Sequence, residues 1–99
     1  MAEVIWAVRA YEHLIQIGEY IEKDSPIQAR RVVQLVVKET RRLKDNIRIG
    51  HLIPEIREDN YRELKVFSYR IMYKILSNDQ VAIVGIVHAR RLFDREMID

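Results

Sequence analysis

The sequence of 99 residues contains no cysteine, only three glycines and only two prolines. The absence of cysteine excludes disulfides, thiolate metal sites and thiol nucleophiles. No apolar run approaches the ~20 residues that a membrane-spanning helix needs, and the N-terminus shows no secretory signal pattern. With 48% hydrophobic and 32% charged residues, the composition is typical of a globular domain and not of a disordered chain. We therefore expect a single cytoplasmic domain over residues 1–99, without membrane contact.

The three histidines, His13, His51 and His88, show no spacing with acidic residues that is typical of a metal site. The sequence therefore predicts neither a metal ion nor a cofactor. A lone histidine at a strand end, as expected for His88, is more often a hydrogen-bonding group than an acid catalyst.

Charge is distributed unevenly, although the net charge is only +2. Residues 26–48 carry a net charge of +5 and residues 61–91 carry +4, and acidic segments separate these basic blocks. Such segregation indicates a polarised surface that suits an anionic partner. Arg70 and Arg90 lie in the second block, where arginines on a strand surface are suited to phosphate groups or acidic side chains.

The N-terminal half predicts one strand and two helices. Glu3–Trp6 (EVIW) is short, apolar and β-prone. Over residues 7–23, and again over residues 26–45, apolar side chains recur every three or four positions, which is the spacing of an amphipathic helix. Ser25 suits the N-cap of the second helix and Pro26 suits its first position. Because the link is short, we expect an antiparallel helical hairpin.

Two segments of the C-terminal half lack a regular pattern. Residues 46–60 contain Gly50 and Pro54 among clustered charges, which predicts an irregular crossing from the helices to the sheet. The tail, Leu92–Asp99, mixes charges with apolar residues and predicts either a short helix or a mobile end.

Three strands are predicted between these segments, over Tyr61–Val66, Tyr69–Leu76 and Val81–Val87. Strict alternation in the second strand places Arg70 on the face opposite Tyr69, and we expect that face to be open. The third strand is apolar on both sides, as in a central strand covered on both faces. The predicted fold is α+β: an N-terminal strand and an antiparallel helical hairpin packed on a mainly antiparallel four-stranded sheet.

Five segments stand in an order and spacing that matter together: EVIW, YIEKDSPIQAR, IGHLIPEIR, YRELKVFSYRIMYKI and VAIVGIVHARR. In this arrangement the chain resembles the RelE/ParE superfamily of toxins from bacterial and archaeal type II toxin–antitoxin modules. The resemblance covers nearly the whole chain. It implies a RelE/ParE-like toxin that a cognate antitoxin neutralises by wrapping the hairpin and the sheet. It also implies assembly as a homodimer or as a toxin–antitoxin heterotetramer.

The superfamily divides by target. RelE-like members cleave ribosome-bound mRNA by attack of a 2′-hydroxyl on the adjacent phosphate, without a metal, whereas ParE-like members inhibit DNA gyrase. The ending His-Ala-Arg-Arg is similar to the ParE-type His-Gly-Arg-Arg, with Ala89 in place of glycine. No tyrosine follows Tyr73, although active ribonucleases of the superfamily have a late tyrosine. Both features favour the ParE-like branch.

For the ribonuclease branch, the resemblance implies five catalytic candidates. Arg62 and Arg70 would bind phosphate, Arg90 would stand at the end of the last strand, Glu55 would take the 2′ proton, and His88 would protonate the leaving 5′ oxygen. Structural alternatives exist for three of them: a cross-strand ion pair for Arg62, for example with Asp79, solvation of the loop for Glu55, and a hydrogen bond for His88.

Three hypotheses therefore stand: a toxin that inhibits gyrase, a ribosome-dependent mRNA endoribonuclease, and a degenerate toxin that only binds its antitoxin. Whether the chain is an enzyme, a metal-independent mRNA interferase, stays open at this point.

Overall fold

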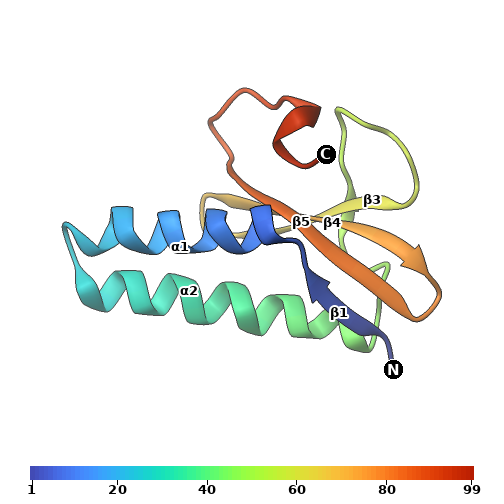
Figure 1. The fold of residues 1–99 in the computed structure, drawn as a ribbon, viewed down its shortest axis with the longest axis horizontal. Coiled ribbons are helices and arrows are strands. Elements are labelled where there is room, and N and C mark those ends of the chain that lie inside the picture. The colour runs from blue at the N-terminus through green and yellow to red at the C-terminus, as the bar shows by residue number, and fades with distance from the viewer.

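The computed structural model describes all residues, 1–99, as a pair of α-helices packed on a five-stranded sheet (Figure 1). In chain order the elements are β1 (Glu3–Trp6), α1 (Val8–Glu22), α2 (Pro26–Arg41), the 3₁₀ turn η1 (Arg42–Lys44), β2 (His51–Leu52), β3 (Tyr61–Val66), β4 (Tyr69–Ser77), β5 (Gln80–His88) and the 3₁₀ turn η2 (Arg95–Met97). The strand order is β1-β5-β4-β3-β2, with β1 parallel to β5 and all other neighbours antiparallel. The predicted α+β fold is confirmed. None of the helices combines the length and the apolar character needed to cross a membrane.

The helical hairpin forms as the sequence predicts. The Ser25 hydroxyl accepts a hydrogen bond from the backbone N–H of Gln28 at 3.1 Å, and Pro26 occupies the first turn of α2. This cap satisfies one of the free N–H groups at the start of the helix. The second helix ends earlier than expected, at Arg41, because the chain tightens there into η1 before it leaves the hairpin.

The predicted number of strands, four, is wrong. His51–Leu52 forms a fifth strand, β2, in which His51 pairs with Glu63 and Leu52 pairs with Arg62. Two residues are too few to show alternation, and Gly50 and Pro54 on either side indicate a loop. The rest of residues 46–60 is an irregular crossing, as predicted.

Both faces of the sheet are covered. The larger core lies between the sheet and the hairpin and includes Ile71, Tyr73 and Ile83. A second cluster lies on the opposite face, where the crossing and the C-terminal segment fold over the strands (Figure 1). Its five buried residues are Ile53, Tyr61, Met72, Val87 and Ile98. The tail is therefore a short 3₁₀ turn packed on the sheet, which agrees with one of the two predicted alternatives.

This second cluster corrects the expectation that the face of β4 with Arg70 is open. Arg70 is 8% exposed and Met72 is fully buried. The expectation was wrong because alternation shows on which face a side chain lies, but not what covers that face. Gly85 in β5 permits the cover: a Cβ there would lie 2.6 Å from the Ile98 side chain.

Candidate functional site

Arg70 is the centre of a buried group of charges on the face of the sheet away from the helices. Its Nη1 and Nη2 donate to the two carboxylate oxygens of Glu55 at 2.9 and 2.7 Å. Its Nε and Nη2 donate to Oε2 of Glu63 at 2.9 and 2.6 Å. The ring of Phe93 lies against the guanidinium, with its centroid 5.6 Å from Cζ. Arg70 is thus held by two carboxylates and an aromatic ring.

The charges of this group shift one another's proton affinities. Hydrogen bonds from Arg70 hold the pKa of Glu55 below its ordinary value, so this carboxylate is ionised at neutral pH. The pKa of Arg70 is raised further above its already high value. The hydrogen bonds to Glu55 have the largest effect, and those to Glu63 add to it. Both oxygens of Glu55 accept hydrogen bonds from the same guanidinium, and this pairing lowers the affinity of Glu55 for a substrate proton.

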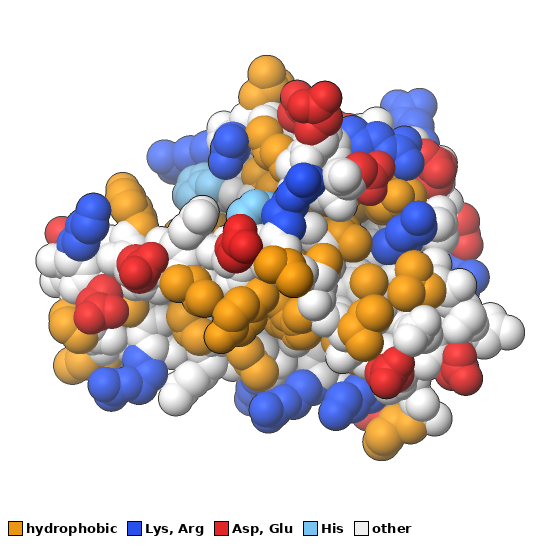
Figure 2. All heavy atoms as spheres, in the orientation of Figure 1, with side chains coloured by type: hydrophobic (Ala, Val, Ile, Leu, Met, Phe, Trp, Pro, Cys, Tyr) orange, Lys and Arg blue, Asp and Glu red, His pale blue; other side chains and the backbone are white.

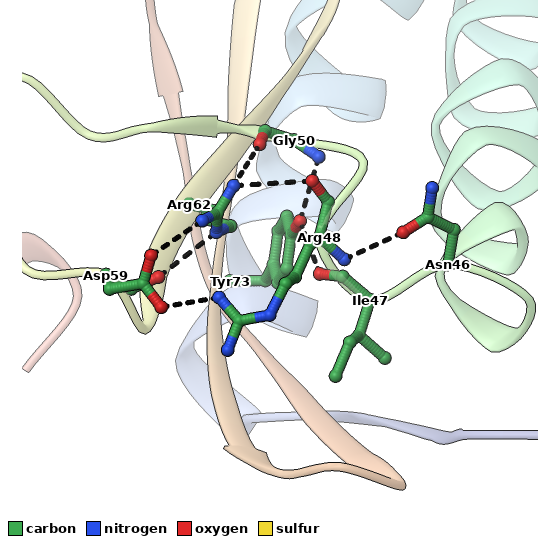
Figure 3. A network of polar contacts seen from close by, with 7 residues as sticks. All are labelled: Asn46, Ile47, Arg48, Gly50, Asp59, Arg62 and Tyr73. Carbon is green, nitrogen blue, oxygen red and sulfur yellow. Dashed lines mark hydrogen bonds and ion pairs between the residues drawn. The ribbon is translucent and has the colours of Figure 1, made fainter.

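Arg62 has a different set of partners at the other end of β3 (Figure 3). Its Nη2 donates to Oδ1 of Asp59 at 2.8 Å, and its Nε donates to the backbone carbonyl of Asp59 at 3.0 Å. Its Nη1 donates to the carbonyl oxygens of Gly50 at 3.0 Å and of Arg48 at 3.3 Å. Arg48 also pairs with Asp59. Arg62 therefore ties the two ends of the irregular crossing together. It does form an ion pair, but with Asp59 in the crossing and not across the strands as foreseen.

The side chain of Tyr73, from β4, also holds the crossing in place (Figure 3). This fully buried side chain donates its hydroxyl to the carbonyl of Ile47 at 2.8 Å and accepts from the N–H of Gly50 at 3.0 Å. A Cβ on Gly50 would lie only 2.6 Å from the carbonyl oxygen of Glu63 and 2.8 Å from the Tyr73 hydroxyl, so glycine is required for this close approach.

His88 and Arg90 lie at the C-terminal end of β5. Nδ1 of His88 accepts the backbone N–H of Arg90 at 3.0 Å, and the His88 ring packs edge-on against Tyr69 at a centroid distance of 5.4 Å. His88 lines a cavity together with residues of α1, so it lies on the helical side of the sheet. The Arg90 side chain is exposed and makes no hydrogen bond or ion pair.

Of the five candidate residues, only Arg70 and Glu55 contact each other through both side chains, whereas His88 meets Arg90 only at its backbone N–H. Arg62 is engaged with the crossing, and His88 lies across the sheet from the Arg70 pair. Sequence reasoning missed Glu63 as the buried partner of Arg70. The available signal was a carboxylate in an otherwise apolar stretch of β3, on the strand that pairs with β4. No group of three or more His, Asp or Glu residues is arranged to hold a metal ion.

Comparisons with known proteins agree with this architecture. Among proteins with curated descriptions, none matches the chain. A solved structure described as "Chromosomal ParDE TA system from P. aeruginosa" shares the fold, with a TM-score of 0.73 at 19% identity over 91% of this chain and 98% of that chain. The family model "ParE toxin of type II toxin-antitoxin system, parDE" matches residues 4–93. Since this match runs from β1 to the segment beyond β5, the chain belongs to the ParE toxin family of type II toxin–antitoxin systems.

Proposed function

We propose that this chain is a toxin that inhibits DNA gyrase, and that a cognate antitoxin neutralises it. Its membership of the ParE toxin family supports the toxin assignment and the antitoxin partner. The single observation that favours a protein target over RNA is the separation of the candidate catalytic residues, with Arg70 and Glu55 on one face of the sheet and His88 on the other.

Metal-independent RNA cleavage needs a base for the 2′ proton, cations for the phosphorane and an acid for the 5′ oxygen, all around one phosphate. Here Arg70 directs its donors to two carboxylates, and Glu55 is held by the arginine that would have to bind the phosphate. A phosphate on Arg70 would have to take the place of Glu55, whose side chain is 41% exposed, and would then lie beside the buried carboxylate of Glu63. Bringing a phosphate next to a like charge that is 3% exposed is unfavourable. Inhibition of a protein target has no such requirement, because it needs only an exposed surface.

The antitoxin has apolar surface to cover on α1. Val8, Tyr11 and Ile15 follow one another at helical spacing and are 74%, 56% and 44% exposed. Figure 2 shows hydrophobic side chains gathered over the helical hairpin. The strands β1 and β2 are the edges of the sheet, and an edge strand pairs readily with an added strand. We infer that an antitoxin segment lies along the hairpin and reaches one of these edges.

The target is tested with the purified chain in two parallel assays. We expect inhibition of DNA supercoiling and the appearance of gyrase-dependent DNA breaks, and no cleavage of ribosome-bound mRNA. Cleavage of that mRNA, lost in Arg90→Ala, would overturn the proposal in favour of a ribonuclease. Arg90 is the informative position because its side chain is exposed and unpaired, so its loss does not disturb the fold. A chain inert in both assays that still binds its antitoxin would leave only the degenerate toxin.

A paired substitution separates a structural role of Arg70 from a catalytic one. Replacing both Arg70 and Glu63 by methionine removes the buried charges together and keeps the volume similar. We expect Arg70→Met alone to melt at a lower temperature and to lose gyrase inhibition as that temperature is approached, and the double variant to regain both. Gyrase inhibition that stays absent in a folded double variant would contradict a purely structural role.

A further inference from the structure

A cavity of about 500 Å³ opens on the helical side of the sheet, between α1 and the end of β5. Polar side chains meet there from four parts of the chain: His13 and Tyr20 from α1, Tyr69 from β4, His88 from β5, and Arg91 just after β5. None of the nine residues that line the cavity is acidic. In Figure 2, histidine side chains lie close to Lys and Arg side chains above the hairpin.

The two imidazoles are fixed as hydrogen-bond donors. Nδ1 of His13 accepts the backbone N–H of Ile86 at 3.1 Å, and Nδ1 of His88 accepts the backbone N–H of Arg90 at 3.0 Å. A ring nitrogen that accepts a hydrogen bond carries no proton, so the proton of each ring is on Nε2. Neither Nε2 has a hydrogen-bond partner in the protein. Burial, followed by two neighbouring arginines, lowers the pKa of His13 and keeps its ring in this neutral form.

Other donors in the cavity also lack an acceptor. The Arg91 guanidinium makes no hydrogen bond or ion pair, and the hydroxyls of Tyr20 and Tyr69 have no partner in the protein. Burial raises the pKa of Tyr69, so this hydroxyl stays protonated at neutral pH. The cavity thus presents imidazole, phenol and guanidinium donors without an internal acceptor, which is the donor set that binds an oxyanion.

Two features decide which oxyanion fits. Arg91 is the only permanently charged residue that lines the cavity, which matches the single charge of a carboxylate better than the double charge of a phosphate monoester. Ile17 and Ile86 form an apolar wall beside the donors. A free inorganic ion has no apolar group that could pack on this wall, whereas a peptide can carry apolar side chains next to its acidic ones.

We propose that this cavity binds an aspartate or glutamate carboxylate from an acidic, partly apolar segment of a protein partner. The carboxylate contacts Nε2–H of His13 and His88 and the guanidinium of Arg91, and a neighbouring apolar side chain of the partner packs on Ile17. This proposal does not rest on gyrase being the target, because it concerns recognition of the acidic segment alone.

The test uses NMR titration of the purified chain with the peptide acetyl-Leu-Glu-Leu-amide and its matched control, acetyl-Leu-Gln-Leu-amide. We expect the glutamate peptide to bind about tenfold more tightly, the effect of one charge-assisted hydrogen bond at a site open to solvent. Binding should shift the ¹⁵Nε2 resonances of His13 and His88. Equal affinity for the two peptides, or unchanged imidazole resonances, would overturn the proposal.

Variants and a competing ion locate the site. Arg91→Gln should weaken binding of the glutamate peptide about tenfold, whereas Arg41→Gln, which removes the same charge from the exposed far end of α2, should leave it within about twofold. Equal losses in both variants would mean that only net charge matters and would refute a site. Inorganic phosphate that binds more tightly than the peptide and displaces it would replace the proposed ligand by a phosphate group.

Discussion

Replacement of Arg70 by methionine should destabilise the chain by about 3–5 kcal/mol, the cost of leaving one charge of a buried pair without its partner. The cost arises mainly at Glu63, which is 3% exposed and accepts two hydrogen bonds from Arg70. Glu55 contributes little, because its side chain is 41% exposed and regains water when the arginine is lost. For a domain with a free energy of unfolding of about 5–15 kcal/mol, this loss removes a large share of the total.

The double variant, Arg70→Met with Glu63→Met, should recover most of that loss, since no buried charge remains unpaired. Its free energy of unfolding should lie within about 1–2 kcal/mol of the wild-type value. Urea unfolding followed by circular dichroism at neutral pH measures all three free energies. The exposed pair of Arg42 and Glu39 offers a control, since Arg42→Met should change stability by only about 0.5 kcal/mol. The reasoning is refuted when Arg70→Met costs less than about 1 kcal/mol, or when the double variant is no more stable than Arg70→Met.

Three further predictions concern the irregular crossing and the loss of stability at acidic pH. Gly50→Ala should lower the free energy of unfolding by about 1–3 kcal/mol, because its Cβ would meet the carbonyl of Glu63 and the side chain of Tyr73. Tyr73→Phe should cost about 1–3 kcal/mol, since the buried carbonyl of Ile47 and the N–H of Gly50 lose their partner, and thermal unfolding checks both variants. Glu55 has a folded pKa below its ordinary 4.5, so its stabilising effect is present above that pH and is lost as the pH falls through the folded pKa. Glu55→Gln should therefore flatten the loss of stability between pH 6 and pH 3 in urea titrations, and an unchanged slope would contradict the pairing.

The parts of the fold that sequence patterns predicted are those in which one periodicity extends over many residues. Both helices and the strands β3, β4 and β5 are of this kind, and the cap at Ser25 depends on residues only three apart. Strand β2 was missed because two residues are too few to show the alternation of a strand. The HARR ending and the segment order were sufficient to indicate the toxin family, since they combine many weak local signals over the whole chain.

The environment of the candidate site could not be predicted, because it depends on contacts distant in sequence. Arg70 meets Glu55 fifteen residues before it and Phe93 far after it, and neither contact follows from the pattern of β4. Alternation correctly placed Arg70 on the face opposite Tyr69. The mistake lay in treating a face with one arginine as solvent-exposed, although Met72 beside it indicated a second apolar layer.

The cations of residues 61–91 fall into two groups, those that have a partner in the structure and those that do not. Arg62 and Arg70 are paired with carboxylates, and Lys74 lies over the ring of Tyr61, 5.2 Å from its centroid. The three cations without a partner are Lys65, Arg90 and Arg91. Strand register places these three at one end of the meander: Val66 pairs with Tyr69, Tyr69 pairs with His88, and the N–H of Ala89 donates to the carbonyl of Ser68 at 2.7 Å.

The uncompensated charge of this block is therefore presented at the corner where β3 turns into β4 and β5 ends, and not on the face that carries Arg70. Cations that already have carboxylate partners contribute little to the field that an approaching anion meets, whereas exposed unpaired cations contribute most of it. An acidic partner is thus steered toward this corner, which adjoins the cavity between α1 and the end of β5, where hydrogen-bond donors lack an internal acceptor. Because these charges are exposed, the rate of association should fall steeply as salt is raised, and Arg90→Gln with Arg91→Gln should remove most of that salt dependence in stopped-flow measurements with an acidic peptide. An equal salt dependence in Arg70→Met/Glu63→Met and in the wild type would agree with this location of the charge, and its loss in that variant would contradict it.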